Sequence, residues 1–187
     1  MNFSPLEIAA VAFTLANVWL AVKENMWTWP TGIASVILYA ILFYQSRLYA
    51  NAGLQVIFFV LSIHGWYEWL RGGVNKTELR VRRTTRRQWI GCAIAGIVLT
   101  AFLMWLLRRV NGSAPLSDAV TTAFSIVGQW MLNEKLLENW FIWLAVDIIY
   151  VPLFLFSGRR PSAALYAFFC ILCVKGLIDW RRSLASA

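Results

Sequence analysis

The chain has 187 residues, of which 60% are hydrophobic and 14% charged, and its formal net charge is +8 at pH 7. A mean hydropathy of +0.62 excludes an ordinary soluble domain and indicates a membrane protein. In such a protein the basic residues report topology rather than a nucleic-acid partner, and we expect no nucleic-acid partner.

Seven apolar stretches are long enough to form membrane-spanning helices, because about 20 residues in helical conformation cross a hydrocarbon core of about 30 Å. In chain order they cover residues 6–22, 26–44, 52–70, 88–107, 116–133, 139–156 and 162–179. The sequence therefore predicts an all-α integral membrane protein with seven transmembrane helices. The first stretch should remain in the mature chain, because acidic Glu7 precedes its core and no small-residue cleavage site follows.

Lysine and arginine are divided unevenly between the two sides of such a bundle. The larger group comprises Lys23, the basic residues of segment 71–87, Lys135, Lys175, Arg181 and Arg182. The smaller group comprises Arg47, Arg108, Arg109, Arg159 and Arg160. Short loops rich in these residues stay cytoplasmic, so we expect the N-terminus outside, the C-terminus in the cytoplasm, and segment 71–87 beside anionic headgroups.

Similar motifs recur along the chain and indicate an internal duplication. FTLANVW at 13–19 matches FSIVGQW at 124–130, and GWYEW at 65–69 matches GLIDW at 176–180, both at an offset of 111. ENMWTW at 24–29 matches ENWFIW at 138–143 at an offset of 114. The prediction is a 3+1+3 arrangement with a first three-helix repeat in 1–70, a basic loop and linker helix in 71–115, and a second repeat in 116–187. Three spans plus one linker make the repeats parallel, as in some transporters whose substrate site lies between the halves.

The stretch 139–156 carries the sharpest candidate site. Asp147 lies about eight residues into this apolar helix, where a charged residue is costly and marks function by default. Spacings of three and four place Trp140, Trp143, Asp147 and Tyr150 on one helical face. Two indoles, a carboxylate and a phenol suit a flat, cationic, hydroxyl-bearing solute, so this face predicts a substrate site.

Structural roles compete with this interpretation. Trp140 could belong to the interfacial aromatic belt, and Asp147 could pair with Lys175 or relay protons instead of touching a ligand. At the offset of 114, Ile33 and Met26 stand where the second copy has Asp147 and Trp140. This asymmetry favours a functional role for the latter two, whereas Trp29 and Trp143 would be shared scaffold.

Further polar residues within the helices are weaker candidates for substrate contact, because many such residues bond across helices for structural reasons. They are Asn17, Tyr39, Gln55, Gln129, Asn133 and Tyr166. There is no phosphate-binding glycine loop, no metal-ligand spacing and no nucleophile with supporting partners, so we expect no enzyme activity, no cofactor and no metal. A transporter is favoured, and a membrane binding or sensor protein or a membrane enzyme is the alternative.

The motifs WPTG, FYQSRLYA, GLQ and VDIIYVP, the last following the Trp-x-x-Trp of NWFIW, resemble the PnuC-type vitamin transporters over nearly the whole chain. The resemblance implies the seven-helix fold of the sugar-transporting SWEETs, a homotrimer, and a multi-pass location in the bacterial inner membrane. It implies a site lined by the Trp-x-x-Trp motif, here Trp140 and Trp143. It also implies ion-independent facilitated diffusion of nicotinamide riboside, trapped by a cytosolic kinase, while relatives carry thiamine or riboflavin.

Overall fold

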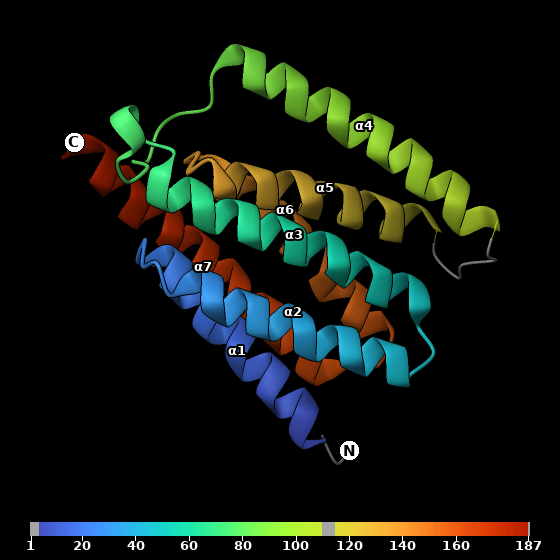
Figure 1. Ribbon diagram of the computed structural model, residues 1–187. Helices are drawn as coiled ribbons and strands as arrows, with labels where there is room; N and C mark the ends of the chain where they lie inside the picture. The colour runs from blue at the N-terminus through green and yellow to red at the C-terminus, as the bar shows by residue number, and fades with distance from the viewer. Residues whose placement is uncertain (1–3, 110–114, 187) are drawn as a thin grey trace. The chain divides into compact units, whose positions relative to one another are not determined.

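The computed structural model describes residues 4–109 and 115–186, and within them the chain forms seven α-helices and one short 3-10 helix (Figure 1). They are α1 (Pro5–Val22), α2 (Thr28–Gln45), α3 (Tyr49–Arg71), η1 (Val74–Lys76), α4 (Arg86–Arg109), α5 (Pro115–Asn133), α6 (Asn139–Phe156) and α7 (Arg160–Ala185). The predicted all-α class and order of helices are confirmed.

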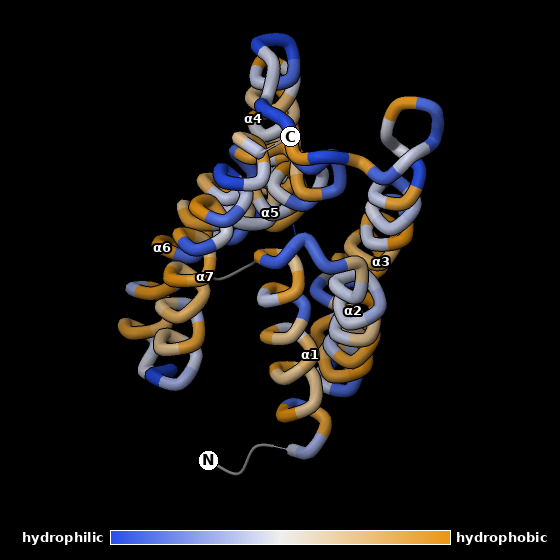
Figure 2. Tube along the Cα trace, turned by 90° about the vertical axis from the view of Figure 1, so that its left-hand side faces the viewer, coloured by the Kyte–Doolittle hydropathy of each residue, from blue (hydrophilic) through white to orange (hydrophobic). Residues whose placement is uncertain are grey.

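The helices differ in how well their own composition suits a bilayer. Among the described residues, α1, α4, α6 and α7 are long and apolar enough to cross a membrane. The other three lack a stretch that is apolar enough, and polar side chains within them include Gln55 in α3 and Asp118 in α5. The coarse prediction of a multi-helix membrane protein is supported, and seven spans stay a prediction. Hydrophilic residues gather at the helix ends and loops (Figure 2).

The start of α1 is fixed by local chemistry. Ser4 is the N-cap, and its hydroxyl accepts a hydrogen bond from the Glu7 backbone N–H at 3.2 Å. The Glu7 carboxylate accepts one from the Ser4 N–H at 2.7 Å, and Pro5 occupies the first helical position, where no N–H is needed. Glu7 therefore helps to begin α1, and it is acidic where a signal peptide would have basic residues.

The chain folds as two compact units, each assembled from segments that are distant in sequence. The first contains Met1–Arg80, Asn133–Lys135 and Ile178–Ala187, as far as these are described. In it α1 packs on α2 and α2 packs on α3. Polar contacts join α1 to α2, since the hydroxyls of Thr14 and Ser35 lie 2.6 Å apart.

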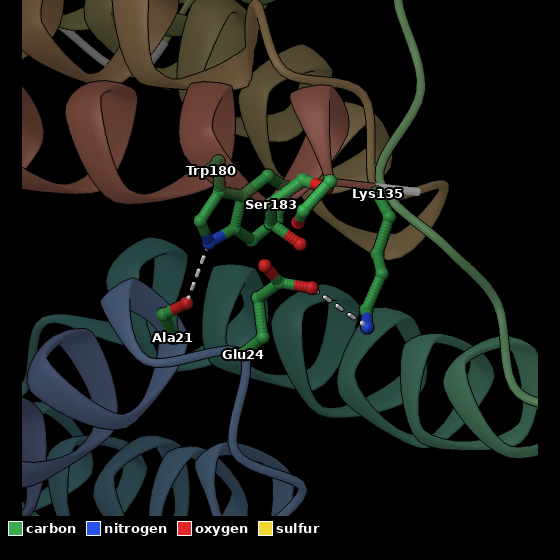
Figure 3. A network of polar contacts seen from close by, with 6 residues as sticks. Ala21, Glu24, Lys135, Trp180 and Ser183 are labelled. Atoms are coloured by element: carbon green, nitrogen blue, oxygen red, sulfur yellow. Dashed lines mark hydrogen bonds and ion pairs between the residues drawn. The ribbon is translucent and has the colours of Figure 1, made fainter.

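Three tryptophans form the core of the first unit. Trp29 packs edge-on against Trp69 at 5.2 Å between ring centroids, and Trp69 lies 6.0 Å from Trp180. Lys135 forms an ion pair with Glu24 at 3.3 Å (Figure 3). Its Nζ also lies 4.4 Å from the centroid of the Trp69 ring. The lysine of this ion pair therefore also packs on the face of an aromatic ring, and a cation and a ring face attract each other.

The second unit contains Val81–Leu132 and Leu136–Leu177. Its core joins Cys92 of α4 to Val127 and Met131 of α5 and to Leu136. The extended segment before α4 is tied down by Glu138, whose carboxylate accepts hydrogen bonds from the backbone N–H and hydroxyl of Thr84 at 2.8 and 2.7 Å.

The turns that precede α2 and α6 have the same backbone. Glu24 and Lys135 both adopt the left-handed conformation, with φ of 52° and 48°. In each turn the next residue, Asn25 or Leu136, donates its N–H to a carbonyl five residues earlier at 2.9 Å. Both correspondences have an offset of 111.

The turns that follow α2 and α6 repeat at the same offset. Arg47 and Gly158 have φ of 59° and 71°, and the residue after each donates its N–H to a carbonyl five residues earlier at 2.8 Å. Tyr39 stacks on Phe43 four positions on, and the corresponding Tyr150 stacks likewise on Phe154.

These correspondences correct the match at 114, which is three residues out of step. At the offset of 111 the counterpart of Trp140 is Trp29 rather than Met26. The counterpart of Asp147 is Val36 rather than Ile33. Trp29 and Trp143 are thus not equivalent. The three identical residues in ENMWTW and ENWFIW suggested a different alignment from the one that the backbone of both turns supports.

Candidate functional site

The candidate site is built on α6, which follows the turn at Lys135 and runs through an apolar sequence. Trp140 and Asp147 are buried, with 3% and 5% of their surface exposed. Trp143 and Tyr150 are half-buried. At about 100° per residue the four side chains span an arc of about 80°, so they share a face but not a line.

Trp140 and Asp147 contact α7. A Cβ atom added at Gly176 would collide with the indole of Trp140, so the ring lies directly on the α7 backbone. One turn earlier on α7, the thiol of Cys173 lies 3.5 Å from Oδ2 of Asp147. These two residues therefore form the α7 side of the face.

Trp143 and Tyr150 contact α5. A Cβ atom at Gly128 would lie 3.3 Å from Cε2 of the Trp143 indole. The hydroxyls of Tyr150 and Thr121 are hydrogen-bonded at 3.0 Å. The Tyr150 ring also packs at 4.8 Å on Tyr166 of α7, so it touches both neighbours of α6.

The carboxylate of Asp147 lacks a strong partner. Its hydrogen bond comes from a thiol, which is a weak donor, and no ion pair of the described residues includes it. The described partner of Asp147 is thus Cys173, and the alternative of a pair with Lys175 stays a prediction. A buried carboxylate without a cation is costly, so this position favours binding of a cationic group.

Two other predicted residues belong to the same unit. Tyr166 packs against Tyr150, Phe154 and Phe169, the last edge-on at 5.8 Å. Gln129 is half-buried and follows Gly128 on α5. Six of the ten predicted residues thus lie in the second unit, on α5, α6 and α7.

The remaining four belong to the first unit, and two of them have clear structural bonds. Asn17 donates from its side-chain amide to the Thr28 carbonyl at 2.6 Å. Asn133 donates to the Leu61 carbonyl at 2.8 Å. Tyr39 takes part in the stack on Phe43, and Gln55 is half-buried on α3. For Asn17 and Asn133 these bonds favour the structural interpretation.

Sequence reasoning missed the small residues against which the site side chains pack. Gly128, Gly176, Cys173 and Thr121 each contact a predicted residue of α6. An isolated glycine within a helical pattern was the available signal, because it marks close packing of a neighbour. Within the described residues no three His, Cys, Asp or Glu side chains could hold a metal ion.

Comparison with known proteins places the chain among transporters. The sequence profile of the nicotinamide mononucleotide transporter family matches residues 4–182. The nicotinamide riboside transporter PnuC of Escherichia coli K12 is 26% identical and aligns with 97% of this chain and 87% of its own. The riboflavin/roseoflavin transporter RibM of Streptomyces davaonensis is 30% identical and aligns with 89% of this chain and 79% of its own.

A solved structure extends the likeness to the fold. The crystal structure of the vitamin B3 transporter PnuC is 25% identical, with a TM-score of 0.78, and covers 97% of this chain and 82% of its own. These relatives are transporters, which confirms the predicted class and excludes the enzyme alternative at the level of the family. By the match over 4–182, the chain belongs to the nicotinamide mononucleotide transporter family.

Proposed function

We propose that this protein carries nicotinamide riboside across the bacterial inner membrane by ion-independent facilitated diffusion. The observation that carries the proposal is Asp147, a buried carboxylate whose described partner is a thiol, set among three aromatic side chains. A pyridinium ring supplies the missing cation and a flat surface. Relatives named as nicotinamide riboside transporters support this choice of substrate.

Each group of the substrate has a matching side chain on α6 or beside it. The indoles of Trp140 and Trp143 offer ring faces to the cation, and Asp147 accepts either its charge or a ribose hydroxyl. The phenols of Tyr150 and Tyr166 lie next to each other and can take the sugar. A carboxylate at this place repels a phosphate, which favours the riboside over the mononucleotide.

Riboflavin is the second candidate, because RibM is a similar protein over most of its length. Its ring system is neutral, so the charge of Asp147 contributes less to its binding than to that of a pyridinium. Conversion of Asp147 to Asn should therefore weaken binding of the riboside more than that of riboflavin. The same variant thus separates the two substrates.

The test is uptake by purified protein in liposomes. Labelled nicotinamide riboside should equilibrate across the membrane without a proton or sodium gradient, and unlabelled riboside should compete better than the mononucleotide, thiamine or riboflavin. Accumulation that requires a proton gradient would contradict facilitated diffusion. Binding without flux would indicate a sensor, and nanomolar thiamine binding with none for the riboside would replace the proposed substrate.

The finer architecture is part of the proposal. We infer two parallel three-helix repeats, α1–α3 and α5–α7, joined by the linker helix α4, and the repeated turns at an offset of 111 support this. The N-terminus lies outside and the C-terminus in the cytoplasm, as the distribution of basic residues favours. Reporter fusions at the C-terminus test this orientation.

Assembly and trapping follow from family resemblance. The proposal is a homotrimer that depends on a cytosolic kinase to phosphorylate the imported vitamin and retain it. Native mass spectrometry of the purified protein tests the trimer. Uptake by cells with and without that kinase tests trapping, since liposomes should reach only equilibrium.

A further inference from the structure

Two glycines lie directly against the indoles of the Trp-x-x-Trp motif. A Cβ at Gly176 would overlap the Trp140 ring, and one at Gly128 would lie 3.2 Å from Cγ2 of Ile142 and 3.3 and 3.4 Å from Cε2 and Nε1 of Trp143. The first overlap could be relieved only by movement of the ring or of α7. The second needs a shift of a few tenths of an ångström. The two glycines therefore set where the indoles lie.

Only one of these contacts has a counterpart in the α1–α3 copy. Gly65 corresponds to Gly176, and a Cβ there would overlap the indole of Trp29, the counterpart of Trp140. This contact is common to both copies. Substitution of Gly65 is therefore a control for substitution of Gly176, because both glycines pack against a tryptophan ring.

The other contact is reversed between the copies. The counterpart of Gly128 is Asn17, and the counterpart of Trp143 is Gly32. In the first copy the larger side chain is on the first helix, and a Cβ at Gly32 would lie 2.6 Å from Nδ2 of Asn17. In the second copy the larger side chain is the indole on α6. The exchange puts a ring beside Asp147 and Tyr150 where the first copy has none.

We propose that Gly128 and Gly176 are positioning residues for substrate binding, because their lack of a side chain fixes the two indoles on the helical face that carries Asp147. This inference rests on the proposed function. Gly176 holds Trp140 at the α7 side of the face, and Gly128 holds Trp143 at the α5 side. Neither glycine needs to touch the substrate, and each acts through its indole.

The experiment combines a spectroscopic and a binding measurement on the full-length protein. 5-Fluorotryptophan is incorporated, and the ¹⁹F resonances of Trp140 and Trp143 are assigned with Trp140→Phe and Trp143→Phe. Gly128→Ala should move the Trp143 resonance alone and weaken nicotinamide riboside binding about 3- to 10-fold, because small displacements of binding groups already lower affinity. Gly176→Ala should move the Trp140 resonance and weaken binding by more than about 10-fold.

Two glycine-to-alanine controls isolate the effect. Gly91 in α4 has nothing within 4 Å of an added Cβ, so Gly91→Ala should change neither resonance nor affinity. Gly65→Ala should lower the unfolding temperature and leave the affinity of the folded fraction unchanged. If Gly176→Ala does not fold, the milder Gly128→Ala decides the question alone.

The outcomes separate this inference from the proposed function. A shifted Trp143 resonance with unchanged affinity in Gly128→Ala would overturn the positioning role and leave only packing. An unshifted resonance would overturn it as well. If wild-type protein binds no nicotinamide riboside, the proposed function fails, while shifted resonances together with altered affinity for riboflavin would still support positioning.

Discussion

Asn17 on α1 lies against Gly32 on α2 in the first copy, whereas Gly128 on α5 lies against Trp143 on α6 in the second. The two turns around α2 and those around α6 nevertheless have the same left-handed residues and hydrogen bonds. Backbone correspondence thus survives where side-chain size is reversed. Because each contact keeps one large and one small partner, the helices can pack closely in both copies.

The copies also differ in charge within the helices. Asp147 of α6 corresponds to Val36 of α2, while the tyrosine and phenylalanine that stack one turn further on are common to both. The shared side chains are those that pack the helix. The residues that differ are those with the chemistry to hold a ligand, which supports the proposal that α6 recognises the substrate.

The largest expected effect is at Asp147. Asp147→Asn should lower the affinity for nicotinamide riboside by at least about 30-fold, since truncating one member of a buried charge pair costs about 2–5 kcal/mol. Calorimetric titration measures this affinity. Asp179→Asn, which alters a partly exposed ion pair with Lys23 at 3.2 Å, is the control and should bind normally. Equal affinity of both variants would show that the charge of Asp147, which the first copy lacks, does not contribute to binding.

A smaller effect is expected from the ion pair that joins the two equivalent turns. Lys135→Met should lower the free energy of unfolding by about 1–3 kcal/mol, because it leaves Glu24 without its cation and Trp69 without its cation–π partner. Thermal unfolding in detergent gives this value. Lys23→Met removes a lysine that is 46% exposed and should change stability by less than about 1 kcal/mol. A larger loss at Lys23 would contradict the assignment of Lys135 to the core.

The turns after α2 and α6 should respond with opposite signs. Arg47 and Gly158 both have positive φ, which costs a residue with a Cβ about 1–2 kcal/mol. Arg47→Gly should therefore stabilise the protein slightly, and Gly158→Ala should destabilise it by about 1 kcal/mol. Unfolding midpoints of the two variants check the prediction. Changes of the same sign would show that the turns are not equivalent.

The smallest effect is at the shared tyrosine. Tyr150→Phe removes the 3.0 Å hydrogen bond to Thr121 but keeps the ring stack, so stability should fall by about 1 kcal/mol. If the phenol also binds ribose, affinity should fall by less than about 10-fold. Tyr39→Phe in the first copy should leave affinity unchanged. A loss of binding at Tyr39 as large as at Tyr150 would place substrate contacts in both copies.

Much of the fold follows from hydrophobic periodicity and length. The bounds of α5 and α6 agree with the apolar stretches 116–133 and 139–156, because a helix in an apolar solvent must satisfy its backbone internally. The match of ENMWTW with ENWFIW failed for a physical reason. The identity of a loop residue is less constrained than the backbone geometry of the turn, which the left-handed residues Glu24 and Lys135 define.

The candidate site was predicted in part. Periodicity placed four residues on one face of α6 and even implies their order around it, with Trp140 and Asp147 on one edge. Periodicity did not predict which neighbouring helix, α5 or α7, packs against each edge of the face. The contact of Asp147 with Cys173 could not be predicted by counting depth along two helices, because such counting ignores their rotation, and the pairing of Asp147 with Lys175 stays a prediction.

The sequence by itself determined that this is a helical membrane protein, that its helices recur, and that α6 carries an acidic aromatic face. Those properties depend on composition and on the 3.6-residue period, which are local. The tertiary structure decided that the offset of 111 rather than 114 holds at the turn before α6, and it decided the partner of Asp147 and the glycines on which the two indoles lie. Such contacts join residues on different helices, and close packing selects them only when the helices come together.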